Sequence, residues 1–173
     1  LRGNFVVLTN GEHEGRRGVN RLVEEALGDQ VKPDREGVYL PGLAAGGVQL
    51  QDRFGQLSHP GVSEAEMAFL AAAPQRMEQM LLERLPAELP EASSEQLKAL
   101  AHQAVLDTQV SPTINLNGIF ALVPGDVSRQ RRLQQMLAEL MDQLLQEAAA
   151  AELDGSFFLH VAPNLGRDAE GRE

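Results

Sequence analysis

The stretch INLNGIFALVPGDVSRQRRLQQMLAELMDQLLQEAAAAELDGSFFLHV, residues 114–161, decides how the fold is interpreted. Its first part, 114–123, is largely apolar, which is typical of a strand buried on both faces. Residues 127–153 place leucine and methionine at helical spacing along one broad stripe. Residues 157–161 are again mostly apolar. The stretch therefore predicts a strand–helix–strand (βαβ) unit with two parallel strands and a right-handed crossover.

The chain before this unit divides into two regions of different character. Residues 1–62 hold short strand candidates between glycine and proline turns, together with one helix predicted over 17–27. Residues 63–108 predict a pair of helices. Each begins after a serine that is followed three positions later by glutamate or glutamine, as in a capping box. Pro74 predicts a kink or a break in the first of them.

Together these segments predict a single α+β or α/β domain over residues 1–163. Its mixed sheet contains the C-terminal βαβ unit, and three longer helices cover it. Residues 164–173 are polar and predict a flexible tail. The strands expected outside the βαβ unit lie at 4–8, 38–40, 48–51 and 56–58.

Composition limits the possible functions. The net charge of −10 disfavours nucleic acid as a partner, because affinity for a phosphate backbone comes largely from lysine and arginine. The absence of cysteine excludes thiol catalysis and thiolate metal sites. No apolar run reaches the roughly 18 residues that a membrane span needs. We therefore expect a cytoplasmic protein with no membrane span, cofactor or bound metal.

The charged corner Gly-Glu-His-Glu-Gly, residues 11–15, allows two interpretations, a metal site or a solvated turn. His13 between two glutamates resembles a metal ligand set, but neighbouring residues in a turning segment point in different directions. A zinc site needs three converging ligands, which helical spacing supplies and this spacing does not. A solvated turn is therefore the favoured interpretation, and a metal site at His13 the alternative.

The same segment resembles a KOW motif, a short β-element of ribosomal and transcription-elongation proteins. The shared residues are a Val-x-Leu run followed by Gly11, Gly15 and Gly18-Val19. The resemblance implies a strand after Gly18 and contact with nucleic acid. The helical spacing over 17–27 and the acidic charge predict a helix there and no nucleic-acid partner.

The start of the helix at 127–153 is the best candidate binding site. Ser128, Arg129, Arg131 and Arg132 lie in its first turns, where the positive end of the helix dipole disfavours cations. Something negative is expected to offset them. The possibilities are local capping and salt bridges involving Asp126, an acidic protein surface, or a small anionic ligand.

The length of that helix predicts an uncovered apolar surface. A helix over 127–153 extends roughly 39 Å at 1.5 Å per residue, whereas a ten-residue strand reaches about 33 Å. The overhanging end would need cover from the helix that follows residue 63 or from a partner, either a second copy of the chain or another protein. The predicted interface residues are Met136, Leu137, Leu140, Met141 and Leu144.

The leading functional hypothesis is therefore a non-enzymatic interaction or assembly module that self-associates through its Met/Leu-rich helices. No catalytic residue can be assigned, because no nucleophile elbow or metal-ligand spacing occurs. The alternative is an enzyme or a binder of small anions. Its site would lie at the start of the helix near Ser128 and would use the three arginines, with His160 as a possible addition.

Overall fold

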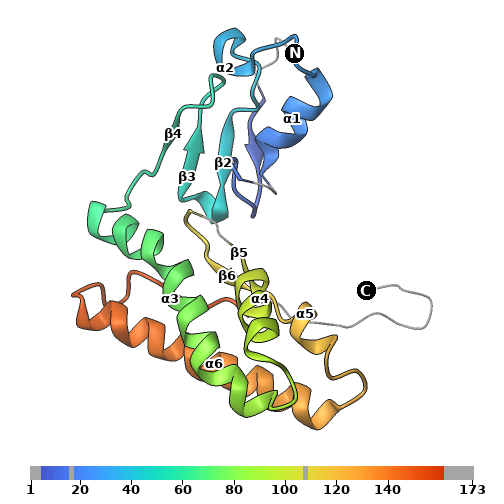
Figure 1. The fold of residues 1–173 in the computed structure, drawn as a ribbon. Helices are drawn as coiled ribbons and strands as arrows, with labels where there is room; N and C mark the ends of the chain where they lie inside the picture. Colours follow the sequence, from blue (N-terminus) through green and yellow to red (C-terminus); the bar gives the residue numbers. More distant parts are fainter. Residues whose placement is uncertain (1–4, 16–17, 107–108, 162–173) are drawn as a thin grey trace.

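A computed structural model describes residues 5–15, 18–106 and 109–161. Figure 1 shows two parts stacked end to end. The sheet part, residues 5–62, contains a four-stranded sheet with two short helices, and the helical part, residues 63–161, contains the longer helices. The predicted single domain with a mixed sheet and helices is confirmed at this level. The predicted tail at 164–173 lies outside the described residues.

The sheet is built from short strands in the order β1-β2-β3-β4. β1 (Val7–Leu8) runs parallel to β2 (Gly42–Ala44), and the remaining pairs, β2 with β3 (Gln49–Gln51) and β3 with β4 (Leu57–Ser58), are antiparallel. A 3-10 turn, η1 (Ala45–Gly47), joins β2 to β3. The parallel pair therefore lies at the first edge of the sheet, with both carboxyl ends on the side of the helical part (Figure 1).

Two helices connect β1 to β2. α1 (Val19–Leu27) confirms the helix predicted from the apolar spacing, and Gly28 follows it as the C-cap. α2 (Pro33–Glu36) is a single turn that the sequence did not suggest, although its proline at the first helical position is a common start. No strand forms at 38–40, and β2 begins at Gly42, inside the Pro-Gly pair that followed the expected strand.

The helical part contains α3 (Glu64–Glu88), α4 (Ser94–Ala104), α5 (Asn117–Phe120) and α6 (Val127–Ala150). Both predicted capping boxes are present, with Ser63 and Ser93 as the caps of α3 and α4. A two-stranded ribbon, β5 (Val105–Leu106) with β6 (Thr113–Ile114), follows α4. No described helix is long and apolar enough to cross a membrane.

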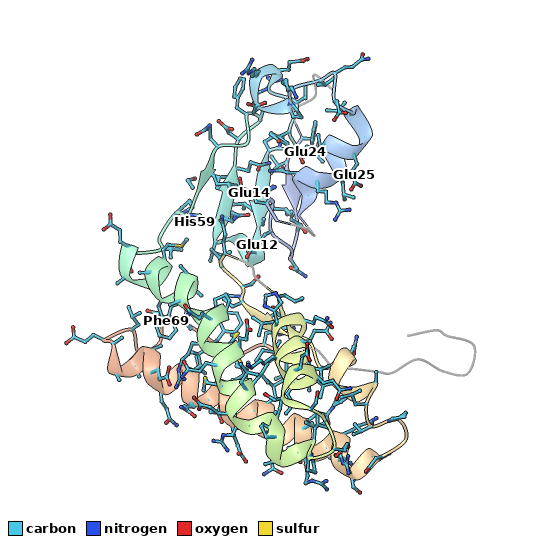
Figure 2. All side chains as sticks on the ribbon, in the orientation of Figure 1. Glu12, Glu14, Glu24, Glu25, His59 and Phe69 are labelled. Carbon is cyan, nitrogen blue, oxygen red and sulfur yellow. The ribbon has the colours of Figure 1, made fainter. Side chains whose placement is uncertain are left out.

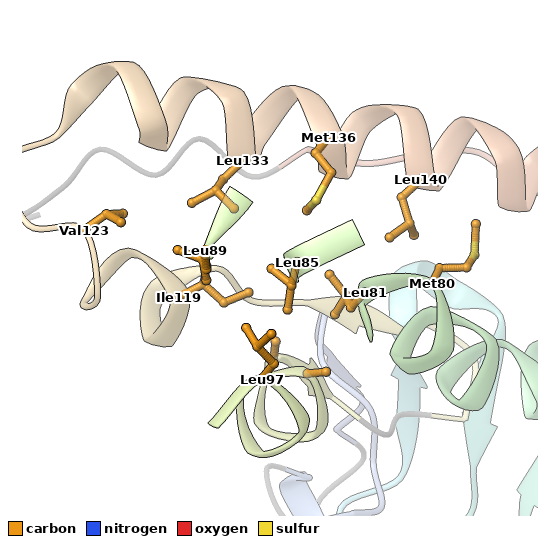
Figure 3. Packing of buried hydrophobic residues seen from close by; sticks show 12 residues of the cluster. Met80, Leu81, Leu85, Leu89, Leu97, Ile119, Val123, Leu133, Met136 and Leu140 are labelled. Carbon is orange, nitrogen blue, oxygen red and sulfur yellow. The ribbon is translucent and has the colours of Figure 1, made fainter. Parts of the chain in front are cut away.

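The main core lies between α3, α4, α5 and α6 (Figure 3). Its fully buried members include Leu81, Leu85, Leu89, Ile119 and Leu133. α3 continues through Pro74 and Pro86 instead of breaking, although each proline lacks the N–H for one helical hydrogen bond. The burial of the α3 side chains on either side of these prolines offsets that loss.

The predicted βαβ unit is wrong, although its helix is confirmed as α6. Residues 114–123 form the end of β6 and the short helix α5, because the side chain of Asn115 accepts a hydrogen bond from the backbone N–H of Asn117 at 2.8 Å and turns the chain. Residues 157–161 form no strand, and Phe157 stacks on Phe69 of α3 with ring centroids 5.2 Å apart. The two parallel strands on which the predicted overhang rested are therefore not formed, and α6 packs mainly on α3.

Candidate functional site

Two of the three arginines at the start of α6, Arg129 and Arg132, form ion pairs within the chain. The carboxylate of Asp126 accepts a hydrogen bond from the backbone N–H of Arg129 at 2.9 Å and caps the helix. The Arg129 guanidinium pairs with Glu91, and Arg132 Nε lies 3.2 Å from a carboxylate oxygen of Glu88. Among the three alternatives that the sequence allowed for these arginines, these contacts correspond to local capping and salt bridges.

The remaining members of the predicted anion site do not converge with them. Ser128 and Arg131 are exposed, and neither lines the groove of about 230 Å³ between α3 and α6. That groove brings Arg84 and Arg132 together with two carboxylates, those of Glu88 and Glu139. His160 is exposed beyond the end of α6. The structure therefore assembles no concentrated positive site here, and anion binding at α6 stays a prediction.

The predicted interface residues lie mostly inside the molecule. Met136, Leu140 and Leu144 are buried against the helical core, with at most 7% of each residue exposed. Leu137 and Met141 are half-buried. The apolar stripe on α6 is covered by packing within this chain, mainly against α3. An ion pair between Arg76 of α3 and Glu147 of α6, with two hydrogen bonds, also joins the two helices.

Buried polar side chains gather in the sheet part, at the charged corner. Across the described residues the buried polar set consists of Glu12, His13, Asn20, Gln49 and Gln51. The interpretation of residues 11–15 as a solvated turn is therefore wrong for two of its members, since His13 is 0% exposed and Glu12 7%. Buried polar groups require partners, and these partners fix the corner to the sheet.

Three hydrogen-bonded contacts hold the corner against β2 and β3. The backbone N–H of His13 donates to the side-chain oxygen of Gln49 at 2.8 Å, and the ring Nε2 donates to the carbonyl of Gly42 at 3.1 Å. Asn20 and Gln51 exchange two amide hydrogen bonds of 2.6 and 2.9 Å. The chain between β1 and α1 is therefore anchored by its polar side chains, and the histidine serves this anchoring.

Glu12 points the other way, toward the helical part, and Figure 2 places it at the sheet end nearest that part, with Glu14 farther along the sheet part. Its carboxylate accepts hydrogen bonds from the backbone N–H groups of Gln109, Val110 and Ser111. The corner thus brings the carboxyl end of β1 next to the loop between β5 and β6.

The carboxyl ends of the parallel pair carry a short polar turn, Thr9-Asn10-Gly11. The Thr9 hydroxyl oxygen accepts a hydrogen bond from the Gly11 N–H at 3.1 Å, which leaves its hydrogen free to donate elsewhere. The Gly11 carbonyl accepts from the Ala45 N–H at 2.9 Å and fixes the turn to the end of β2. In open α/β sheets, ligands bind outside the carboxyl ends of the parallel strands.

Sequence reasoning recognised this turn but assigned it no function. Thr9-Asn10-Gly11 is a turn signal that predicts the end of the strand at 4–8, whereas the parallel pairing of β1 with a strand 35 residues later in the chain was not predicted. Strand pairing is a long-range property, so the local pattern alone does not reveal that this turn lies at the carboxyl end of a parallel pair.

A hollow of about 430 Å³ beside α1 and α2 is a second possible site. Its charged lining consists of the carboxylates of Glu14, Glu24 and Asp34 and a single arginine, Arg21. Such a lining opposes the binding of a phosphate in this hollow. Among the side chains that the structure describes, no group of three His, Asp or Glu lies close enough to hold a metal ion.

Tyr39, which lines this hollow, has a raised pKa. Its hydroxyl donates to Glu24 at 2.6 Å, and this hydrogen bond, with smaller contributions from burial and neighbouring carboxylates, raises its pKa to about 12. The ordinary value is 10.0. Because the folded pKa is the higher one, the hydrogen bond stabilises the fold fully below pH 10, and this stabilisation is lost as the pH rises through about 12.

The phenol titration can be measured directly, because Tyr39 is the single tyrosine and the chain has no tryptophan. We expect the absorbance at 295 nm to change with a midpoint near pH 12 in the folded chain. Glu24→Gln removes the negative charge and is expected to move the midpoint toward 10. Circular dichroism at each pH confirms that the fold persists, and a wild-type midpoint near 10 would contradict the Tyr39–Glu24 contact.

Comparisons with known proteins give a consistent result. The chain matches the model of the glucosylglycerol-phosphate phosphatase family over residues 1–173. A protein of Synechocystis sp. (strain ATCC 27184 / PCC 6803 / Kazusa) named glucosylglycerol-phosphate phosphatase is 49% identical over 170 residues. The match covers 98% of this chain and 40% of that relative, so the chain spans less than half of the relative's length. No solved structure matches.

These matches overturn the leading hypothesis from the sequence. A non-enzymatic, self-associating interaction module of unknown function was predicted, with an enzyme as the alternative, and the family and the relative are both phosphatases. The prediction failed because helical apolar stripes were taken as a surface, whereas they form the core. The polar turn at residues 9–11 is recognisable as a turn, but its sequence carries no catalytic or phosphate-binding motif.

Proposed function

The chain belongs to the glucosylglycerol-phosphate phosphatase family, and from this membership we propose that it forms part of an enzyme that hydrolyses the phosphate ester of a phosphorylated glucosylglycerol. The products of such a reaction are the free alcohol and inorganic phosphate. The chain matches 40% of its relative's length, so the activity is proposed for the full-length protein.

The observation that supports this proposal is the turn at the carboxyl ends of β1 and β2. A phosphate binds most readily to clustered N–H and O–H donors. The turn supplies the hydroxyl hydrogen of Thr9 and the exposed side-chain amide of Asn10, at the edge where sheets of this kind bind ligands. Residues 109–111 bind the carboxylate of Glu12, the residue that follows the turn, so the helical part is attached to the sheet part next to the proposed phosphate contact.

Substitution of Thr9 tests the proposed phosphate contact. Thr9→Val preserves the shape of the side chain but removes the donor, so we expect kcat/KM for phosphate release in the full-length protein to fall about 10- to 150-fold. This is the effect of losing a hydrogen bond to a charged group, about 1.5–3 kcal/mol. Thr9→Ser keeps the hydroxyl and should retain most of the activity.

Ser58→Ala provides the matched control, because it removes an exposed hydroxyl at the opposite edge of the same sheet. Its kinetics should equal those of the wild type. Thermal unfolding of each variant separates lost contact from lost fold. Equal activity of Thr9→Val and wild type would refute the assignment of the phosphate to this turn, and no release of phosphate by the wild type would refute the proposed reaction itself.

Two expectations from the sequence stay proposals beside the activity. One is a cytoplasmic location, and the other is a protein, not a nucleic acid, as any macromolecular partner. Cell fractionation tests the first. Binding measurements at low salt with a generic duplex DNA and a single-stranded RNA test the second, since any backbone affinity is strongest there.

A further inference from the structure

We propose that Glu12 is a positioning residue for the phosphatase reaction, which holds the helical part against the turn at residues 9–11. The proposal rests on the proposed function. Glu12 follows Gly11 directly in the chain, so a force on its carboxylate acts on the turn that carries Thr9. Its side chain contacts a loop almost 100 positions later in the sequence.

The carboxylate of Glu12 is satisfied by that loop. One oxygen accepts from the backbone N–H of Gln109 at 2.9 Å. The other accepts from the N–H groups of Val110 at 2.8 Å and Ser111 at 3.1 Å, and from the Ser111 hydroxyl at 3.3 Å. Hydrogen bonds from N–H groups to a carboxylate are roughly twice as strong as neutral ones. Three consecutive N–H groups around one anion form a backbone nest.

The burial of Glu12 distinguishes it from the other glutamate of the corner. Glu12 is only 7% exposed, so breaking its contacts would leave a desolvated charge without partners. Glu14 is exposed and makes a single bond of 3.3 Å to the flexible side chain of Gln109. Glu12 therefore carries the rigid contact, and Glu14 offers a control of equal charge two positions away.

The connection between the two parts gives this contact its importance. The described chain passes from the sheet part to the helical part through the segment between β4 and α3, at residues 59–63. A single connecting segment limits how far apart the two parts can lie but does not by itself fix their relative orientation. The nest at 109–111 adds a second attachment at the candidate site itself. Glu12 thereby sets how residues 109–111 lie relative to the turn at residues 9–11, which directly precedes it in the chain.

The test combines kinetics with a distance that reports the arrangement of the two parts. Glu12→Ala in the full-length protein is expected to change kcat and KM together and to lower kcat/KM roughly 10- to 100-fold, as displacement of a site by about 1 Å does. Glu12→Gln retains one acceptor oxygen and should lie between Glu12→Ala and wild type. Glu14→Gln should behave as wild type.

Spin labels at Arg35→Cys and Gln103→Cys, both exposed and on different parts, supply the second readout, because the chain has no cysteine of its own. We expect a narrow distribution of the distance between the two labels when Glu12 is retained, both in the otherwise wild-type protein and in Glu14→Gln. In Glu12→Ala we expect a broader distribution. Amide hydrogen exchange at residues 109–111 should accelerate in Glu12→Ala alone.

The possible results separate this proposal from the one on which it rests. Wild-type kinetics or an unchanged distance distribution in Glu12→Ala, measured in a protein that releases phosphate and responds to Thr9→Val, would overturn the role of Glu12 alone. Failure of the wild-type protein to release phosphate would overturn the proposed function, whereas the distance and exchange measurements would still report whether Glu12 joins the two parts.

Discussion

Replacing Gly42 by alanine is expected to reduce kcat/KM for phosphate release about 100-fold in the full-length protein, since a displacement of about 1 Å at a site has an effect of this size. Gly42 lies in β2 opposite Val7 of β1. A Cβ atom at position 42 would lie 2.0 Å from the carbonyl oxygen of Val7 and 2.6 Å from its nitrogen. Both atoms belong to the backbone, so no rotation of a side chain relieves the overlap.

The consequence of this clash is a displaced β1. The strand is two residues long and pairs only with β2 in the described sheet, so it moves more readily than β2, which is held from both sides. Thr9 and Asn10 follow β1 directly and move with it. The Gly42 carbonyl also accepts the hydrogen bond from His13, and a shifted strand disturbs this anchor of the corner.

Gly118→Ala is the control for Gly42→Ala. Gly118 lies in α5, is exposed, and has no atom within 4 Å of the position where a Cβ would be placed. This variant should retain full activity and gain slightly in stability, since alanine is the better helix former. Full activity of Gly42→Ala would show that the position of β1 does not matter for catalysis, which would contradict a site at its carboxyl end.

The parts of the fold that were predicted correctly are those with local causes. Ser63 and Ser93 cap helices because the side chains of the cap and of the residue three positions later each bond to the other's backbone, and these residues lie close together in the sequence. The helix α6 follows from its apolar spacing in the same way. Such features require no knowledge of distant contacts.

The parts that were missed depend on distant partners. Residues 114–123 are apolar enough for a buried strand, but only Ile114 is in a strand, Ile119 is buried among helices and Leu122 is 43% exposed. The candidate site was missed for the same reason. Nothing near Glu12 in the sequence indicates that residues 109–111 will surround its carboxylate, and the parallel pairing that places Thr9 next to the end of β2 joins segments far apart.

The second large effect is expected for Leu85→Ala, which should lower the free energy of unfolding by about 2–5 kcal/mol, the range for leucine-to-alanine changes in a core. Leu85 is 0% exposed and lies at the centre of the cluster that α3 shares with the other helices (Figure 3). The change removes apolar contacts and leaves a cavity between helices that are held by packing on several sides and cannot fully close it.

Two optical signals locate this effect within the molecule. Circular dichroism at 222 nm follows mainly the long helices, whereas the fluorescence of Tyr39 follows the sheet part, because the chain has no tryptophan. In a single cooperative domain both transitions shift to lower denaturant by the same amount with an unchanged slope. Leu122→Ala, at a partly exposed leucine, should cost far less. A shift of the dichroism alone would mean that the contact through Glu12 does not make the two parts unfold together.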